Sequence, residues 1–268
     1  MAYVRVDRAV KFFPRENGSQ MLVLDGVSFE ATEHGITCLL GPSGCGKSTL
    51  LNAIAGLEKL DQGEIEFRVP GSTLHPTSHI PDLPARSPKL GYVFQDPRLL
   101  NWKRVEDNLV FAFKGMKIPR ESWQGLLEKY LSLVGLLSFR KQYPLYLSGG
   151  MRQRVGLARG LAIEPEILLM DEPFSKLDQL TARQLRQDTV DICPRLGQTT
   201  MLVTHDVEEA AYMGDRIVIF SSRPAHIVEV VDNPLEATKR DLDDLAFIRF
   251  KKRLLQTVLK LVDQEGRV

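Results

Sequence analysis

A glycine-rich segment between a buried strand and a helix constrains this chain more than any other feature. The short apolar run over residues 36–40 is typical of a strand buried on both faces of a parallel sheet. Apolar residues from Leu50 to Leu57 predict a helix that follows closely. The segment between them matches the pattern G-x-x-x-x-G-K-[ST], which we call the P-loop. Its residues are Gly41, Pro42, Ser43, Gly44, Cys45, Gly46, Lys47, Ser48 and Thr49.

The P-loop pattern predicts a phosphate-binding site. Glycines let backbone N–H groups turn toward phosphate oxygens, and the N-terminus of the following helix favours the same anion. Lys47 is expected to supply a mobile charge to the terminal phosphates, and the Ser48 hydroxyl to ligate Mg²⁺. The alternative, a glycine-rich turn that binds nothing, is disfavoured because a strand precedes the segment and a helix follows it.

Two further apolar runs, 167–170 and 200–203, predict buried strands that end in polar residues. At the carboxyl edge of a parallel sheet such residues reach the ligand crevice. We expect Asp171 to hold Mg²⁺ through water and Glu172 to orient and deprotonate an attacking water. His205 is expected to contact the γ-phosphate or to fix that water. Taken alone, these acids could simply follow a strand, and the histidine could be structural.

The rest of the chain predicts an α/β protein. The first 35 residues suggest antiparallel strands around a turn at 14–19, and helical signals dominate 104–162. Prolines make 70–88 an excursion from a hairpin, whose His75 and His79 are more often solvated than metal ligands. An amphipathic helix over about 241–262 is expected to pack on the chain's own body, a partner-binding role being the alternative. Its apolar stripe is Leu245, Ile248, Leu255, Val258, Leu259 and Val262.

Composition disfavours several classes of protein. The 35 Lys and Arg balance 34 Asp and Glu, so nucleic acid is not expected as a partner. No stretch reaches the roughly 18 apolar residues that span a bilayer, and the first residues do not resemble a signal peptide. We therefore expect a cytosolic protein that reaches a membrane only through a partner. Cys38, Cys45 and Cys193 lack metal-ligand spacing and are expected to be reduced thiols.

The segment Leu147-Ser148-Gly149-Gly150, followed by Arg154, resembles the signature motif of ABC ATPases. The resemblance implies a P-loop NTPase with a RecA-like parallel sheet core, an antiparallel β subdomain and an inserted α-helical subdomain. It implies that residues 1–227 form the ATPase domain, or cassette, and that residues 228–268 form a C-terminal extension. It also implies a head-to-tail homodimer, in which each signature closes over ATP bound to the other subunit. The signature residues acting in trans would be Leu147, Ser148, Gly149 and Gly150.

The same resemblance assigns roles to three further residues. Phe13, or Phe12, resembles the aromatic residue that stacks on adenine. Gln95 resembles the glutamine that senses Mg²⁺ and the γ-phosphate and links to the membrane subunit. Asp178 lies in a segment that resembles the loop crossing the dimer interface. By themselves Phe13 could be a core residue and Gln95 a solvated loop residue.

A narrower resemblance points to the nitrate, sulfonate and taurine importer ATPases. It is carried by 99–102, by Met151 and by Ser222-Arg223-Pro224-Ala225-His226-Ile227. It implies a peripheral protein on the cytoplasmic side of the membrane, two permease subunits, an extracytoplasmic solute-binding protein, and Trp102 near the permease-facing surface. A Trp102 packed in its own helical subdomain is the alternative. Exporter or lipid-transporter ATPases, and soluble ABC ATPases acting on nucleic acid or ribosomes, remain alternative functions. The long proline-rich segment, Asn101 and Lys176 depart from the family pattern.

Overall fold

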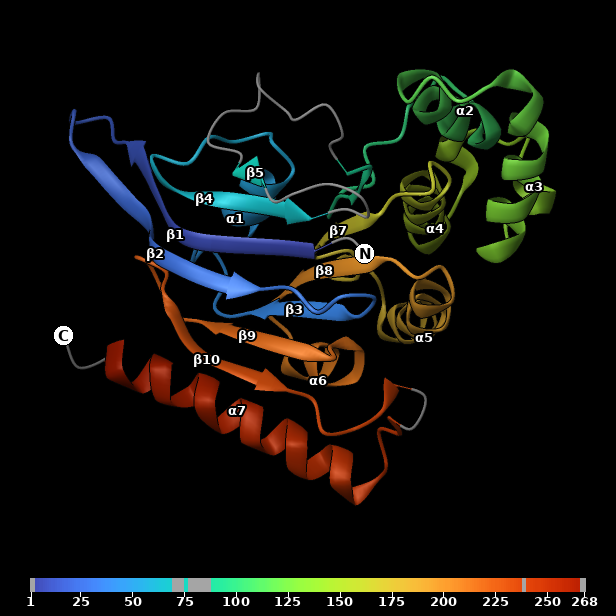
Figure 1. Ribbon diagram of the computed structural model, residues 1–268. Coiled ribbons are helices and arrows are strands. Elements are labelled where there is room, and N and C mark those ends of the chain that lie inside the picture. The colour runs from blue at the N-terminus through green and yellow to red at the C-terminus, as the bar shows by residue number, and fades with distance from the viewer. Residues whose placement is uncertain (1–2, 69–74, 77–87, 238–239, 266–268) are drawn as a thin grey trace. The chain divides into compact units, whose positions relative to one another are not determined.

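The computed structural model describes residues 3–68, 75–76, 88–237 and 240–265. The chain folds into two compact units. Their helices and strands are labelled in Figure 1. Unit 1 comprises Met1–Pro88 and Thr199–Val268, and unit 2 comprises Lys89–Gln198. Most of the proline-rich segment, His79 included, lies outside the described residues. His75 lies in a two-residue strand.

Unit 1 contains an antiparallel sheet with the strand order β2-β1-β4-β5. The predicted turn between the first two strands is confirmed, because the N–H of Arg15 donates to the carbonyl of Ser19 at 2.8 Å. Val4 and Val6 of the first strand are buried, as their alternation predicts. The strands are β1 (Tyr3–Pro14), β2 (Gln20–Glu30), β4 (Gln62–Arg68) and β5 (His75–Pro76).

A second sheet of unit 1 places the P-loop. The strand β3 (Ile36–Leu40) pairs in parallel with both β8 (Thr199–Thr204) and β9 (Arg216–Phe220), and β10 (Ile227–Asp232) pairs antiparallel with β9. Every residue of β3 and β8 is buried, which confirms the prediction of strands covered on both faces. The carboxyl end of β3 therefore delivers Gly41 to the edge where β8 and β9 also end.

The described part of unit 1 contains the helices α1 (Lys47–Ile54), α6 (Val207–Met213) and α7 (Leu245–Glu265). The last helix begins at Leu245 and not near 241, because Asp244 caps it: its carboxylate accepts from the N–H of Ala246 at 2.6 Å. The preceding aspartates form a turn, in which the N–H of Asp244 donates to the carbonyl of Asp241 at 3.1 Å.

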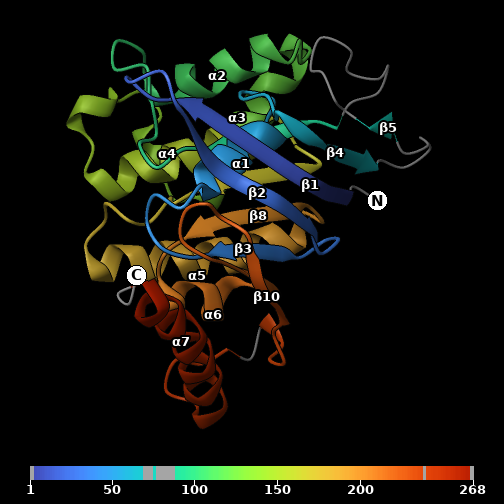
Figure 2. The same cartoon turned by 90° about the vertical axis from the view of Figure 1, so that its left-hand side faces the viewer.

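The buried face of α7 differs from the predicted stripe. The helix does pack on the chain's own body, against α6 (Figure 2). It does so through Phe247, Phe250 and Leu254, all of which are buried. Four residues of the predicted stripe are instead 42% to 69% exposed, so the prediction of the packing face was wrong. Because apolar residues occur on two faces of this helix, spacing alone selected the wrong one. The four exposed residues are Leu245, Ile248, Leu255 and Leu259.

Unit 2 contains one parallel strand pair and most of the helices that the structure describes. The strand β6 (Leu90–Val93) pairs with β7 (Ile167–Asp171), and the signature helix α4 packs on β6 and on the helices α2, α3 and α5. The range 104–162, expected to be helical, lies within this unit. The helices are α2 (Val105–Gly115), α3 (Trp123–Leu133), α4 (Gly149–Leu161) and α5 (Gln179–Arg195), with 3₁₀ turns at Arg120–Ser122, Leu137–Phe139 and Pro144–Tyr146.

The contact between β6 and α4 leads to a stability prediction. A Cβ on Gly91 would lie 2.6 Å from the Gly160 carbonyl oxygen and 2.9 Å from Pro165, and a backbone atom cannot move aside easily. Gly91→Ala is therefore expected to lower the free energy of unfolding by about 2–4 kcal/mol in urea titrations. Gly125→Ala is the control, since Gly125 lies in α3 with no atom near its missing Cβ. An equal effect of both substitutions would contradict the packing argument.

The three cysteines are free and buried, in agreement with reduced thiols. Burial, and to a smaller extent the carboxylate of Glu209, raises the pKa of the Cys38 thiol. Among the described residues, no helix combines the length and apolarity needed to cross a bilayer.

Candidate functional site

The P-loop forms a sharp turn between β3 and α1 in unit 1. Gly44 has a φ of 75° and Gly46 a φ of 133°, backbone conformations that side chains disfavour. Gly46 directly precedes Lys47, the first residue of α1, so the unpaired N–H groups of that helix open into the loop. The sequence pattern and the backbone thus agree on where an anion would be held.

Close packing fixes the two ends of the P-loop. A Cβ on Gly41 would lie 2.9 Å from Phe220 at the end of β9. A Cβ on Gly46 would lie 3.0 Å from the side chains of Val23 and Leu24 in β2. Neither glycine can therefore be replaced without moving its neighbours, and the loop forms a rigid cradle lined by backbone.

Lys47 is the charged residue of this cradle. Its side chain is only 3% exposed, and its ammonium donates to the carbonyls of Gly41 at 2.8 Å and Pro42 at 2.7 Å. A buried ammonium needs such partners, and the loop's own carbonyls supply them here. The donor set of glycine N–H groups, an ammonium and the neighbouring half-buried Ser48 suits a phosphate chain.

The candidate adenine-stacking residues lie near the end of β1. Phe12 and Phe13 are both half-buried. The Lys11 ammonium lies 5.2 Å from the centroid of the Phe13 ring and forms an ion pair with Glu58 at 2.8 Å. The N–H of Phe12 donates to Asp61 at 2.6 Å. Phe13 therefore lies on the same side of the strand as an anchored cation.

His205 follows the last residue of β8 and is exposed. The next residue, Asp206, caps α6 by accepting from the N–H of Glu208 at 2.8 Å. The hydroxyl of Thr204 donates to the buried Glu209. These contacts on both sides of His205 fix its backbone at the edge where β3 also ends.

In unit 2, Asp171 and Glu172 lie at the carboxyl end of β7. Both are half-buried, as expected for residues that leave a buried strand. Glu172 has a φ of 42°, a left-handed conformation that a non-glycine residue adopts at some cost. The Ser175 hydroxyl donates to the Glu172 carbonyl at 3.0 Å and holds this turn. The left-handed backbone at Glu172 therefore ends the extended conformation of β7 and turns the chain away from the direction of the strand.

Gln95 contacts the proposed base directly. Its side-chain amide donates to the Glu172 carboxylate at 3.3 Å and to the Ser175 hydroxyl at 3.1 Å. The structure thus brings together two residues that the sequence singled out 77 positions apart. A glutamine amide at this distance can orient the carboxylate without protonating it.

The signature residues form the N-terminus of α4. The Ser148 hydroxyl caps the helix by accepting from the N–H of Met151 at 3.2 Å. Leu147 and Gly150 are buried, whereas Ser148 and Gly149 are exposed. A Cβ on Gly150 would lie 2.3 Å from the Thr181 methyl group, so the signature packs closely on the start of α5.

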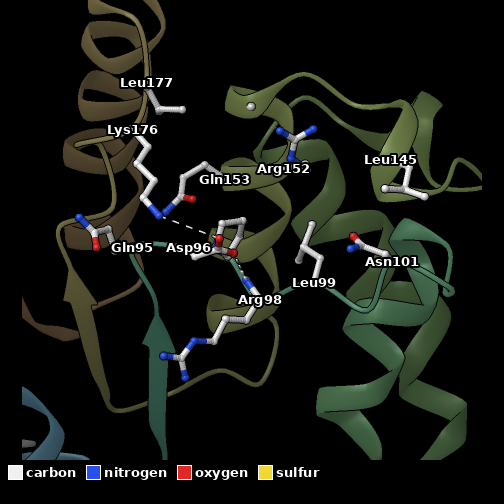
Figure 3. A pocket seen from close by; sticks show the side chains of 12 residues that line it. Gln95, Asp96, Arg98, Leu99, Asn101, Leu145, Arg152, Gln153, Lys176 and Leu177 are labelled. Atoms are coloured by element: carbon white, nitrogen blue, oxygen red, sulfur yellow. Dashed lines mark hydrogen bonds and ion pairs between the residues drawn. The ribbon is translucent and has the colours of Figure 1, made fainter.

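Asp178 precedes α5 and is exposed. Its carboxylate accepts from the N–H of Thr181 at 3.0 Å, and hydrogen bonds from Thr181 lower the pKa of Asp178. Nearby, Lys176 forms an ion pair with Asp96 at 4.0 Å (Figure 3). This departure from the family pattern thus joins the loop of Asp178 to the loop of Gln95.

A pocket of about 450 Å³ lies beside these loops (Figure 3). Gln153 of α4 is buried there, and its side-chain amide donates to the Phe94 carbonyl at 3.1 Å. The signature helix and the Gln95 loop are therefore connected through one side chain. The lining residues are Gln95, Asp96, Pro97, Arg98, Leu99, Asn101, Leu145, Gly149, Arg152, Gln153, Lys176 and Leu177.

Comparison with known families decides the assignment. The family model described as ABC transporter matches residues 24–175, more than half of the 268-residue chain. The chain belongs to the ABC transporter family. It is accordingly an ATP-binding cassette that hydrolyses ATP, and the predicted P-loop NTPase fold is confirmed.

Individual relatives of this ABC cassette give the same result. It is 42% identical over 234 residues to the taurine import ATP-binding protein of Rhizobium johnstonii, covering 85% of this chain and 83% of that one. It is 35% identical over 253 residues to the aliphatic sulfonates import ATP-binding protein of Bacillus cereus, covering 94% of each. A cassette solved as a dimer in a post-hydrolysis state, bound to ADP and Pi, matches with a TM-score of 0.71 and 28% identity. That match covers 87% of this chain and 100% of the other.

Sequence patterns did not identify every residue of the ABC cassette's loops. Ser175 and Gln153 gave no signal as partners, because a serine in a loop and a glutamine on a helix are common everywhere. Trp102 was expected at the surface on the basis of the narrower resemblance. Its side chain is 72% exposed, so the alternative of a packed tryptophan is wrong.

Proposed function

We propose that this cassette energises the import of a small solute of the sulfonate, taurine or nitrate type through two separate membrane subunits. The observation that carries the proposal is the similarity, over most of both chains, to cassettes named for taurine and aliphatic sulfonate import. Those names belong to the relatives. The exposed Trp102 supports a membrane-facing surface here, and a solute-binding protein outside the membrane would complete the system.

In the proposed cycle, the P-loop binds the phosphates of ATP through its N–H groups and Lys47. Ser48, Gln95 and Asp171 are the residues proposed to hold Mg²⁺, since hydroxyl, amide and carboxylate oxygens suit that ion. Bound Mg²⁺ would offset phosphate charge. Phe13 is proposed to stack on adenine, with Phe12 as the alternative. The close packing of Gly41 against Phe220 and of Gly46 against β2 fixes the shape of the P-loop, which supports its assignment to the phosphates.

Hydrolysis requires a group that takes a proton from the attacking water. We assign that role to Glu172, whose carboxylate is oriented by Gln95. His205 is proposed to stabilise charge on the γ-phosphate, together with Lys47. Glu172, His205 and the P-loop each follow the carboxyl end of a parallel strand, where this class of fold binds ligands.

We further propose that two copies form a head-to-tail dimer, with Ser148 and Gly149 of each copy closing on ATP held by the other. Both residues are exposed at a helix N-terminus, which favours an anion. Large apolar side chains near Ser148 and Gly149 are exposed in the single chain. Exposed apolar side chains that cluster in this way support an interface with another chain, which would cover them. They are Leu145, Tyr146 and Leu180, exposed by 70%, 78% and 80% respectively.

The docking site for the membrane subunit is proposed to include a second pocket of unit 2, of about 360 Å³. Arg98 stacks 4.2 Å above the Phe94 ring, and Arg159 donates to the Arg98 carbonyl at 3.0 Å. A short helix carrying apolar side chains and an acidic residue complements this apolar, basic surface. The pocket is lined by Tyr92, Phe94, Arg98, Phe111, Ala112, Arg159, Gly160 and Ile163.

Trp102→Ala tests the proposed contact between this cassette and the membrane subunit. The exposed indole is expected to be buried by the permease, so its removal should lower the fraction of cassette that sediments with membranes by about tenfold. ATP affinity of the isolated cassette should not change. Leu57→Ala, which removes an exposed apolar side chain from unit 1, serves as the control. Unchanged sedimentation of the Trp102 variant would remove this residue from the interface.

Uptake of labelled solute tests the import function itself. In cells that carry this gene, Glu172→Gln should abolish the uptake of labelled taurine, alkyl sulfonate or nitrate, whichever the system transports. The efflux of the same compounds from preloaded cells should not change. Loss of efflux with normal uptake would contradict import.

A further inference from the structure

The loop between β9 and β10 contacts the P-loop through an arginine. The Arg223 guanidinium donates through Nη2 to the carbonyl of Gly44, in the middle of the P-loop. Through Nη1 it donates to the Met21 sulfur at 3.2 Å. Arg223 itself is exposed, although it acts on a residue of the nucleotide site. All these residues are part of unit 1.

The loop that carries Arg223 is held firmly. The buried Ser221 hydroxyl donates to the Ser222 carbonyl at 2.9 Å and accepts from the N–H of His226 at 2.9 Å. The strand β2, which belongs to the antiparallel sheet, is joined to the loop by two hydrogen bonds of 2.9 Å, in which Ala225 donates to Val23 and accepts from Asp25 through backbone groups. The arginine therefore extends from a rigid base that is also joined to β2.

This hairpin and β2 contact the P-loop at three glycines. Phe220, the last residue of β9, packs so closely on Gly41 that no Cβ would fit there. Arg223 holds the Gly44 carbonyl, and β2 closes against Gly46. The outer two contacts are steric, whereas the middle contact is a charge-assisted hydrogen bond to a glycine with a φ of 75°. The contact at Gly44 is made by the polar side chain of Arg223, which lies outside the loop. A substitution of Arg223 therefore removes this contact without changing a residue of the P-loop.

We infer that Arg223 is a positioning residue for the nucleotide, acting through the Gly44 peptide and adding positive charge beside the phosphate chain. The inference rests on the proposed role of the P-loop. A carbonyl held outward keeps the peptide dipole of Gly44 and Cys45 in one orientation, with its N–H side turned away from the arginine. Without that bond, the peptide keeps the longer hydrogen bond from the Cys45 N–H to the Pro42 carbonyl, 3.4 Å, and Gly44 gains conformational freedom.

Met21 connects Arg223 to the candidate base-binding end of β1. Met21 is paired with Phe13 in the β1–β2 register. Arg223 thus contacts both Met21, beside the candidate stacking residue Phe13, and Gly44 of the phosphate cradle. The ribose and α-phosphate of a bound nucleotide would lie between these two places. Guanidinium groups present five N–H donors, so the contacts with Gly44 and Met21 leave donors for a phosphate oxygen.

Equilibrium titration with a fluorescent ADP analogue tests the inference on the full chain. Arg223→Met should weaken binding by about 5- to 10-fold, the loss of one charge-assisted hydrogen bond at a solvated site. Arg223→Lys should bind within about twofold of the parent, because it keeps a donor and the charge. In steady-state turnover the Met variant should raise KM for ATP by the same factor and change kcat little. Arg249→Met, on the exposed face of α7, is the matched control.

The possible outcomes distinguish a failure of this inference from a failure of the proposed function. If the parent chain itself fails to bind the analogue, the assignment of the P-loop fails. If the parent binds and Arg223→Met binds equally well, the inference about Arg223 is overturned while the P-loop assignment stands. A lowered unfolding midpoint of nucleotide-free Arg223→Met that the Lys variant does not restore would also overturn it, because the residue would then be structural.

Discussion

Glu172→Gln is expected to lower the rate of ATP hydrolysis by about 10²–10⁴-fold, while ATP binding persists. The glutamine keeps the size and the hydrogen-bonding capacity of the side chain but cannot accept a proton from water. Gln95 contacts Glu172 through an amide, so the substitution leaves its neighbour a polar partner. The left-handed backbone at Glu172 should remain, because the Ser175 hydroxyl holds it through the main-chain carbonyl of Glu172, which the substitution does not change.

The experiment on Glu172→Gln measures both turnover and molecular size. Hydrolysis is measured by phosphate release, and the dimer by light scattering on a size-exclusion column, with and without ATP in Mg-free buffer containing Na⁺. We expect ATP to convert the Glu172→Gln chain from monomer to dimer, since the nucleotide is no longer consumed. Near-normal turnover of this variant would remove Glu172 from the reaction.

Glu166→Gln is the matched control and should hydrolyse ATP normally. Glu166 lies six residues before Glu172, just ahead of β7, whereas the proposed base follows the other end of the same strand. Its carboxylate accepts from the N–H of Lys89 at 3.1 Å. The control therefore changes the same chemical group next to the same strand without touching the turn that holds Glu172.

The P-loop and the buried strands could be predicted from sequence because each is a local pattern. Glycine spacing fixes where the backbone turns, and an unbroken apolar run fixes a strand covered on both faces. Such features depend on neighbours in the chain, so no tertiary contact was needed to find them.

The missed features depend on contacts between distant parts of the chain. The helix α7 carries apolar residues on two faces, and only its packing against α6 decides that Phe247 and Phe250 are the buried ones. Arg223 lies 179 positions from Gly44, and an exposed arginine in a loop has no distinguishing pattern. The sequence marked Arg223 only as part of a family resemblance and gave it no role. Pairings of this kind become visible once the strand order places two loops at one sheet edge.

Lys47→Met is expected to weaken the binding of ATP and ADP by about 100-fold or more, equivalent to roughly 3 kcal/mol. Methionine keeps the length and apolar stem of the side chain and removes the ammonium. In the nucleotide-free chain that ammonium is buried and donates to the carbonyls of Gly41 and Pro42. The substitution removes the cost of burying a charge, which offsets the loss of these two hydrogen bonds, so the unfolding midpoint without nucleotide should change little.

Thermal unfolding with and without ADP separates these two effects of Lys47→Met. At an ADP concentration of about 100 times its Kd, the parent chain should gain about 2.7 kcal/mol of stability, and the variant almost none. Lys252→Met, which removes an exposed ammonium from α7, should keep the full gain. A variant that unfolds early even without ADP would mean that Lys47 holds the loop together through its two carbonyl partners. A variant that keeps the gain would mean that the backbone N–H groups of the P-loop bind the phosphates without the lysine.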